Sequence, residues 1–254
     1  MFTPIIEDLP NLEDIIEAES GNVNATYLTP KLVIKLNQNH EENDYLANKI
    51  VSDLLSDTFP VVKVIAYDFF DKTTFEVLVM KKTKGIMLMD DIIEINEKSR
   101  EIIFEQVLDV VCKLFEIKFE DFGWINSESK NSFSSYTAFL TNEFDDHVSK
   151  IKAEKLCSLE NISKIEEYFR KHVTVFDKSE AVFIHTDTHM GNILHEGNKL
   201  TAIIDFDHSL KAPKVRSLLS LLGFICLDLF VIHNNLLKAQ KILKNLKEKT
   251  LITC

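Results

Sequence analysis

The sequence predicts a mixed α+β fold with two lobes, a small β-rich lobe over residues 1–84 and a larger, mainly helical lobe over residues 85–254. Three observations predict it. The first ninety residues hold short runs of β-branched and aromatic residues bounded by turn residues, a pattern typical of strands. Beyond Gly85 the apolar residues recur every three to four positions, which is typical of helices. A hairpin of two short strands interrupts the helical part.

The expected order in the N-terminal part is strand, strand, helix, strand, strand. The helix is expected because six apolar residues between positions 46 and 55 fall on one face at helical spacing. The expected elements are strands at 26–29, 32–36, 61–67 and 74–80 and a helix at 41–55.

The C-terminal part is expected to hold five helices and one hairpin. The hairpin turns at Glu196, Gly197 and Asn198, a tripeptide that favours a turn. The expected helices are at 99–117, 132–150, 159–172, 215–232 and 236–247, and the expected hairpin strands are at 192–195 and 200–205.

Composition limits the class of protein. The chain has 254 residues, enough for one sizeable core or for two lobes that share a cleft. Hydrophobic residues make up 45% and charged residues 27%, which is ordinary for a globular protein. The net charge of −11 argues against a nucleic-acid partner, because a phosphate backbone demands a basic face. It suits a cationic small substrate, although acidic composition also serves solubility alone.

The sequence also predicts the compartment. The N-terminus has no basic segment followed by an apolar one, so no signal peptide is expected. Residues 218–232 are the most apolar stretch, and polar residues break it too early to span a bilayer. We expect a cytoplasmic monomer with no membrane partner. Its widely spaced cysteines, which form no CxxC pair, are expected to stay reduced: Cys112, Cys157, Cys226 and Cys254.

Residues 183–207 carry the most specific pattern in the chain. His185, Asp187 and Asn192 form H-x-D-x-x-x-x-N, and the segment I-I-D-F-D brings Asp205. A carboxylate is needed to accept or orient the proton of an attacking hydroxyl. Five residues on (192 − 187), an amide can turn back to hold a metal, and the second acid follows eighteen residues (205 − 187) after the first. Oxygen ligands on short loops suit Mg²⁺.

These residues resemble the catalytic stretch of the aminoglycoside phosphotransferase family, a group with a protein-kinase-like fold that includes choline, homoserine and fructosamine kinases. The resemblance implies that Asp187 is the catalytic aspartate and that Asn192 and Asp205 bind Mg²⁺. It also implies that His185 supports the loop. The alternative interpretation is that these are polar turn residues beside a buried strand. That interpretation does not account for two acids and an amide in this order.

The resemblance extends to the nucleotide side. Lys35, in the apolar strand 32–36, matches the lysine that contacts the α- and β-phosphates. Its acidic partner is expected to be Glu42 on the next helix, with Glu41 as the alternative. Ser20 begins the loop that the family places over the phosphates, a weak pattern because it holds a single glycine.

Residues 79–85, which include Met80 and Lys82, resemble the hinge between the lobes, whose backbone binds the purine. The resemblance thus makes 1–84 a nucleotide-binding lobe and 85–254 a lobe that holds the catalytic centre and the acceptor. ATP is the expected phosphate donor, with GTP left open, and Mg²⁺ is the expected cofactor.

The acceptor side is less specific. The acidic run 142–147 is interpreted either as an anionic wall for an amine-bearing substrate or as a solvated helix face. Asp228 lies in an apolar stretch and is expected to face a partner or the cleft. Asp207 is interpreted either as an aid to the metal or as a cap for the following turn. His189 and His195 are poor candidates for metal ligands, because Mg²⁺ prefers oxygen.

Three departures from the family pattern concern the acceptor and the loop. Thr186 stands where glycine is usual, and Thr188 stands where an apolar residue is common. An Asp-Leu pair usual after Pro213 is replaced by Arg-Ser-Leu at 216–218. The chain also has little length after its last expected helices.

The sequence therefore predicts a phosphotransferase that moves the γ-phosphoryl group of ATP or GTP to a hydroxyl of a small cationic acceptor. An aminoglycoside is the first choice, which implies antibiotic resistance. The alternatives are a metabolic kinase for choline, homoserine or a sugar-like alcohol, and a pseudokinase that binds a nucleotide without turnover.

Overall fold

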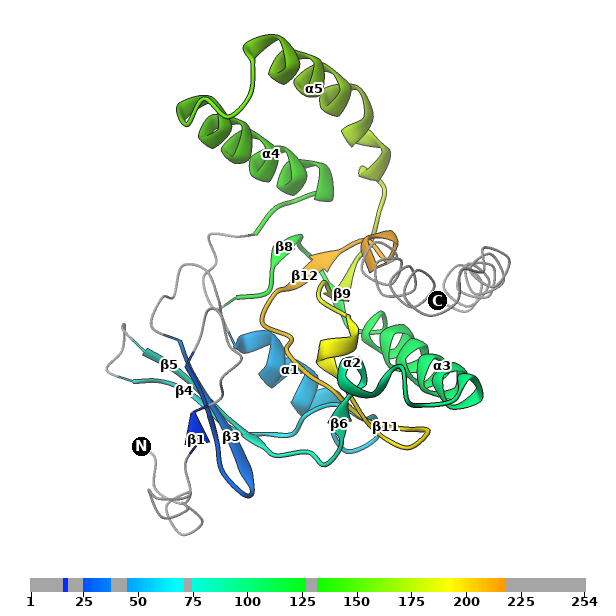
Figure 1. The fold of residues 1–254 in the computed structure, drawn as a ribbon. Helices are drawn as coiled ribbons and strands as arrows, with labels where there is room; N and C mark the ends of the chain where they lie inside the picture. The colour runs from blue at the N-terminus through cyan, green and yellow to red at the C-terminus, as the bar shows by residue number, and fades with distance from the viewer. Residues whose placement is uncertain (1–15, 18–24, 38–44, 71–74, 127–131, 218–254) are drawn as a thin grey trace. The chain divides into compact units, whose positions relative to one another are not determined.

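A computed structural model describes residues 16–17, 25–37, 45–70, 75–126 and 132–217 (Figure 1). The chain divides into two compact units. The first unit contains the described residues up to Val110 together with Asp187–His208, and the second contains Val111–Thr186 and the residues from Ser209 onward. The mixed α+β class is as predicted, and the division of function at residue 84 stays a prediction. Within these described residues, no helix is long and apolar enough to cross a lipid bilayer.

The first unit is built on a five-stranded antiparallel sheet with the order β1-β2-β3-β5-β4. Four of the five strands were expected from the sequence. The turn between β2 and β3 is closed by Thr29, whose Oγ1 accepts hydrogen bonds from the N–H groups of Lys31 and Leu32. The strands are β1 (Ile16–Glu17), β2 (Ala25–Leu28), β3 (Leu32–Asn37), β4 (Val64–Phe70) and β5 (Phe75–Lys81).

Helix α1 (Leu46–Leu55) is shorter in the described residues than the expected helix at 41–55, whose first residues lie outside them. Of the expected apolar face, Ala47, Val51 and Leu55 are buried at intervals of four residues, whereas Leu54 is exposed. The polar residues Asn48 and Ser52 are also buried, which the pattern did not predict. Ser52 ties it to the sheet by accepting the N–H of Val64 at 2.7 Å. At its start, Glu76 of β5 accepts the N–H of Tyr45 at 2.6 Å, which places a carboxylate at the positive end of the helix.

The predicted hairpin is confirmed as β10 (Ile193–Glu196) and β11 (Lys199–Ile203), and β6 (Ile86–Met87) adds a third strand beside β10. Two contacts hold it within the first unit. Ile203 N–H donates to the carbonyl of Pro60 at 2.8 Å. Gln106, on helix α3 (Glu97–Leu114), accepts the N–H of Leu200 at 2.9 Å. The one-turn helix α2 (Leu88–Asp91) precedes α3.

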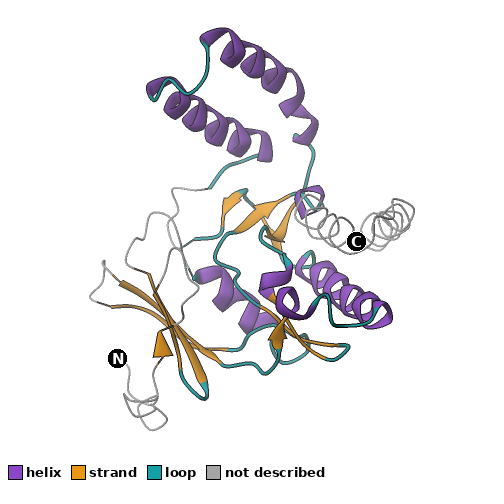
Figure 2. Cartoon of the chain, in the orientation of Figure 1, coloured by secondary structure: helices purple, strands orange, loops and turns teal. Residues whose placement is uncertain are grey.

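The second unit holds a small antiparallel sheet that the sequence did not predict (Figure 2). Its strand order is β7-β9-β12-β8. Its central strand β9 is buried along its whole length. A short apolar run without alternation does not distinguish a strand from a helix, which is why the pattern missed it. The strands are β7 (Lys118–Phe119), β8 (Gly123–Trp124), β9 (Ala181–His185) and β12 (Ser209–Ala212).

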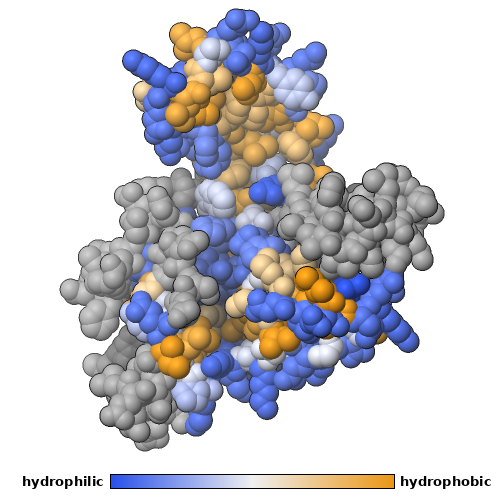
Figure 3. Space-filling view, viewed as in Figure 1, coloured by the Kyte–Doolittle hydropathy of each residue, from blue (hydrophilic) through white to orange (hydrophobic). Residues whose placement is uncertain are grey.

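Two helices of the second unit were expected and are present, α4 (Tyr136–Ala153) and α5 (Leu159–His172), followed by the 3₁₀ turn η4 (Val173–Phe176). Apolar side chains gather between α4 and α5 (Figure 3), where the rings of Phe144 and Phe169 stack at 3.9 Å. Residues 215–217 are helical, as expected for the start of a helix at 215. The rest of that helix, the expected helix at 236–247 and Asp228 lie outside the described residues.

Gly85 is expected to be intolerant of a side chain. Its φ is +123°, and a Cβ there would lie 2.6 Å from Thr201 Oγ1 and 2.8 Å from the carbonyl oxygen of His195. Backbone strain and the clash together are expected to make Gly85→Ala lower the free energy of unfolding by about 2–4 kcal/mol. Gly197→Ala is the matched control, because φ there is +60° but nothing lies within 4 Å. Equal losses for both variants in urea denaturation would contradict the close contact at Gly85.

Candidate catalytic and nucleotide site

The candidate catalytic loop, residues 185–192, closes on itself through Asp187 and Asn192. The chain leaves β9 at His185 and passes through η5 (Met190–Asn192) into β10. The side-chain nitrogen of Asn192 donates to the Asp187 carbonyl oxygen at 2.9 Å and to Asp187 Oδ2 at 3.1 Å. Asn192 is buried, whereas the side chain of Asp187 is about half exposed. The five-residue spacing thus folds the amide back across the loop onto the acid. The role predicted for Asn192, holding a metal, stays a prediction.

His189 makes a second contact with the same carboxylate oxygen. Its Nδ1 accepts the N–H of Gly191 at 3.0 Å, so in the neutral ring the hydrogen is on Nε2. That nitrogen lies 3.5 Å from Asp187 Oδ2. Asn192 and His189 thus both face Oδ2, and Oδ1 is the oxygen to which neither contact is directed. His189 thus contacts two residues of the same loop, Gly191 and Asp187, and the sequence did not predict these contacts.

Asp205 leaves the hairpin at the same end as Asn192. Ile193 pairs with Ile203 at this end of the ladder, and Ile204 N–H donates to the carbonyl of Asn192 at 3.0 Å. Asp205 has φ +66°, a left-handed conformation that aspartate tolerates better than most residues. Strained backbone of this kind gathers at functional sites because surrounding contacts hold it there.

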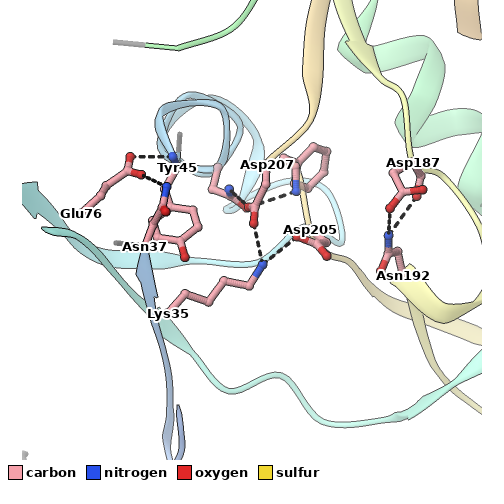
Figure 4. Close-up of polar contacts among 10 residues, drawn as sticks. Lys35, Asn37, Tyr45, Glu76, Asp187, Asn192, Asp205 and Asp207 are labelled. Carbon is pink, nitrogen blue, oxygen red and sulfur yellow. Dashed lines mark hydrogen bonds and ion pairs between the residues drawn. The ribbon is translucent and has the colours of Figure 1, made fainter. Parts of the chain in front are cut away.

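Lys35 joins strand β3 to this end of the hairpin. Its Nζ lies 2.6 Å from Asp205 Oδ1 and 2.9 Å from Asp207 Oδ2 (Figure 4). Burial alone would lower the pKa of Lys35, but the carboxylates of Asp207 and Asp205 outweigh it and raise the pKa above its usual value. The lysine is therefore a fixed positive charge, as a phosphate contact requires.

Asp207 is the more deeply buried of the two acids. Its Oδ1 accepts the side-chain N–H of Asn48, on α1, at 2.7 Å. Burial and the nearby charge of Asp205 raise the pKa of Asp207, while contact with Lys35 opposes the rise. The two raised pKa values are consistent with each other. Two carboxylates stabilise the charged form of Lys35, whereas Asp207 has to share the one positive charge with Asp205. Neither sequence interpretation of Asp207, metal ligand or turn cap, included its contacts with Lys35 and Asn48.

Tyr45 lies beside Lys35, and Glu76 contacts the backbone of Tyr45. The ring of Tyr45 lies 5.8 Å from Lys35 Nζ and is fully buried. Burial and the charge of Asp207 raise the pKa of the Tyr45 hydroxyl. Glu76 also accepts the side-chain N–H of Asn37 at 3.3 Å. No sequence pattern pointed to these residues, because their contacts join strands and helices distant along the chain.

The remaining predicted residues fall in different places. His185 is buried at the end of β9. Met80 is buried in the sheet core against Tyr45 and Leu78, so its side chain is part of the packing. Lys82 is exposed, and its N–H donates to the carbonyl of Lys31 at 2.8 Å. Ser20, Glu42 and the alternative Glu41 lie outside the described residues, so their predicted roles stay predictions.

The side-chain oxygens of Asn192 and Asp205 suit Mg²⁺. Because they are only two, water and phosphate oxygens of the substrate would fill the other coordination positions. Asn192 turns its amide nitrogen toward Asp187, which leaves its oxygen on the other side, and Asp205 adds a partly exposed carboxylate. Two protein oxygens suit a hard cation that keeps waters and takes phosphate oxygens. Among the described residues there is no group of three or more His, Cys, Asp or Glu side chains able to hold a metal. A closed site made of those residue types is therefore not part of the described structure.

Comparisons with known proteins identify the family and the fold. The model of the phosphotransferase enzyme family (APH) matches residues 14–226. A thermostable mutant of the aminoglycoside phosphotransferase APH(4)-Ia, solved with ADP and hygromycin B, has a TM-score of 0.65 at 14% identity, over 87% of this chain and 75% of that one. The gentamicin complex of APH(2'')-IIa has a TM-score of 0.62 at 18% identity, over 82% and 69%.

No curated protein matches the chain. At these identities the solved structures show the fold alone, which is protein-kinase-like as predicted. The family model, in contrast, covers the candidate catalytic loop, the hairpin, Lys35 and most of the chain. The protein is therefore a member of the phosphotransferase enzyme family.

Proposed function

We propose that this phosphotransferase moves the γ-phosphoryl group of ATP, or of GTP, to a hydroxyl of a small cationic acceptor such as an aminoglycoside. The proposal rests on two contacts that lie at the same end of the hairpin. Asn192 closes on Asp187, and Asp205 engages Lys35 two residues beyond the ladder. These are the parts that phosphoryl transfer needs: an acceptor-orienting acid, oxygen ligands and a fixed cation.

Asp187 is proposed to orient and deprotonate the acceptor hydroxyl through Oδ1. The contacts of Asn192 and His189 with Oδ2 hold the carboxylate in one orientation. A hydroxyl placed at Oδ1 donates its proton there as its oxygen attacks the phosphorus in line with the leaving oxygen. His185 supports the loop from the end of β9.

Lys35, Asn192 and Asp205 are proposed to hold the nucleotide phosphates and their metal. Bound Mg²⁺ would neutralise charge on the β- and γ-phosphates, and Asn192 and Asp205 would hold it. Partly buried Val33, Leu194 and Ile204 pack against the core beside Tyr45 and offer apolar faces for a purine. The solved complexes of similar fold hold ADP, AMP-PNP and ATP, which supports a nucleotide donor.

The acceptor class is the most open part of the proposal. Hygromycin B, gentamicin and streptomycin occupy the similar structures and favour a cationic acceptor. One observation favours a second candidate, a metabolic kinase for choline, homoserine or a sugar-like alcohol. In the acidic run on α4, Asp145 pairs with Arg170 and Asp146 lies 2.8 Å from Lys150. Because these acids already face bases, the run offers less negative charge to a cationic substrate than its sequence suggests.

Coupled detection of ADP or GDP over a panel of acceptors tests the function. We expect release above the acceptor-free rate with at least one aminoglycoside, dependent on Mg²⁺, and reduced drug susceptibility of a host that expresses the protein. Release only with choline, homoserine or a sugar alcohol would replace the first candidate by the second. Nucleotide binding without release on any acceptor would favour a pseudokinase, which the intact set Asp187, Asn192 and Asp205 argues against.

A further inference from the structure

Asp207 connects strand β3 to helix α1. One of its carboxylate oxygens, Oδ2, lies 2.9 Å from Lys35 Nζ, and the other, Oδ1, accepts the side-chain N–H of Asn48 at 2.7 Å. Its side chain is only 5% exposed. Both oxygens are therefore engaged by groups of the protein itself, in an environment that strengthens such contacts.

Asn48 holds the same segment a second time. Its Oδ1 accepts the backbone N–H of Phe206 at 3.3 Å, while its Nδ2 donates to Asp207. Asn48 is 4% exposed and Phe206 is 2% exposed. The amide of Asn48 thus fixes two consecutive residues beyond β11 to α1. Through Asp207, which faces Lys35 in Figure 4, it also fixes the lysine. The one acid within α1, Asp53, is exposed and pairs with Lys49 instead.

Asp205 holds Lys35 under different conditions. Its side chain is 38% exposed, and its Oδ1 lies 2.6 Å from Lys35 Nζ. An exposed carboxylate exchanges partners at less cost than a buried one, because solvent compensates for the lost contact. If Asp205 takes a metal ligand role, its contact with Lys35 has to loosen when metal and nucleotide bind. Both oxygens of Asp207, in contrast, are already held by Lys35 and Asn48.

From this difference we propose that Asp207 and Asn48 are the positioning residues of Lys35, with Asp207 as its permanent partner and Asp205 as the partner that Mg²⁺–nucleotide displaces. The proposal rests on the proposed function and adds a role for two residues outside the catalytic motif. In this proposal Asp207, which is buried and held by Asn48 of α1, keeps Lys35 in place for the phosphates. The proposal does not depend on whether Glu42 also approaches Lys35.

Calorimetric titration with AMP-PNP, with and without Mg²⁺, tests it. Asp207→Asn is expected to weaken AMP-PNP binding about 10- to 100-fold, the size expected when a charged hydrogen bond is lost. The factor should be the same with and without metal, because Asp207 acts through the lysine. Asp205→Asn should weaken binding only when Mg²⁺ is present. A metal-dependent effect of Asp207→Asn would identify Asp207 as a metal ligand and overturn the proposal.

Exchanging the amide and the acid between positions 48 and 207 tests the contact between Asn48 and Asp207. Asn48→Asp alone sets two carboxylates against each other and should weaken AMP-PNP binding by at least the same factor. The double variant N48D/D207N restores a donor facing an acceptor across the pair, and the amide oxygen at position 207 can still face Lys35. It should bind AMP-PNP more tightly than N48D does. If the double variant binds no better than N48D, the coupling between α1 and the lysine is absent.

Controls distinguish failure of this proposal from misfolding of a variant and from failure of the proposed function. Asp53→Asn makes the same chemical change as Asp207→Asn at an exposed site of α1 and should leave AMP-PNP affinity unchanged. Urea denaturation shows which variants fold. If Asp207→Asn does not fold, Asn48→Ala, which keeps both acids, is expected to weaken binding about fivefold or more, and unchanged binding would overturn the proposal. Failure of the unsubstituted protein to bind AMP-PNP would instead refute the proposed function.

Discussion

Asp187→Asn is expected to lower turnover about 10²–10⁴-fold, the usual contribution of a positioned general base. Nucleotide affinity should change by less than about tenfold, because Asp187 is proposed to contact the acceptor and not the phosphates. The substitution has nearly the same shape as the native side chain, so the loop should keep its fold. Steady-state kinetics with the best acceptor from the panel, together with calorimetric titration with AMP-PNP, measure the two quantities separately.

The size of this effect follows from the contacts of Asp187 Oδ2. Asn192 Nδ2 donates to this oxygen at 3.1 Å and to the Asp187 carbonyl oxygen at 2.9 Å. An amide introduced at position 187 has to present its oxygen to that donor, since two N–H groups face to face would repel. Its NH₂ group then occupies the position of Oδ1. A hydrogen-bond donor thus replaces the acceptor that the substrate hydroxyl requires, and orientation is lost together with basicity.

Asp57→Asn serves as the control for this variant. Asp57 makes an exposed ion pair with Lys63 at 3.0 Å, and pairs of this kind contribute little to stability. Turnover by Asp57→Asn should equal that of the unsubstituted protein. Unchanged turnover by Asp187→Asn would remove Asp187 from the mechanism, whereas parallel losses of turnover and of AMP-PNP affinity would indicate a disturbed loop rather than a lost base.

The sequence predicted the parts of the site that depend on local spacing. Asp187 and Asn192 are five residues apart, and a single short loop decides whether they meet. The hairpin around Gly197 brings Asp205 back to the end where Asn192 lies, because the second strand of a hairpin runs back along the first. Lys35 followed from the resemblance, and its ion pair with Asp205 joins residues 170 positions apart.

The sequence could not predict the residues whose roles depend on distant contacts. Asn48 was one polar residue on an amphipathic helix, and its contact with Asp207 spans 159 positions. Glu76, fully buried, holds the start of α1 from a strand, although a glutamate in an apolar strand usually indicates an exposed position. Asp207 left two interpretations open because the chain before and after it identifies neither Lys35 nor Asn48 as a partner. Such contacts are set by tertiary packing, which no local pattern encodes.

Asp205→Asn is expected to lower the affinity for Mg²⁺–AMP-PNP at least about 10-fold, the lower end of what even outer-shell partners of a metal contribute. The variant removes the charged oxygen proposed to bind the metal, and it keeps a side chain that tolerates the φ of +66° at this position. Titration of Mg²⁺ at fixed AMP-PNP measures the change. Unaltered dependence on Mg²⁺ would rule out Asp205 as a ligand.

Asp205→Asn should not lower the free energy of unfolding. This result would distinguish a role of Asp205 as metal ligand from a role as structural partner of Lys35. Asp205 and Asp207 place two negative charges around one lysine, and the charge of Asp205 helps to raise the pKa of Asp207. Removing the more exposed acid relieves that repulsion, while Asp207 keeps Lys35 paired. The urea midpoint should therefore stay constant or rise as function falls, the exchange expected where a site is kept for activity at a cost in stability.

Asp205→Ala should be less stable than Asp205→Asn by about 1 kcal/mol, because alanine adopts the left-handed backbone less readily. If both variants instead lose several kcal/mol, Asp205 acts mainly by holding Lys35, and the metal role passes to other oxygens.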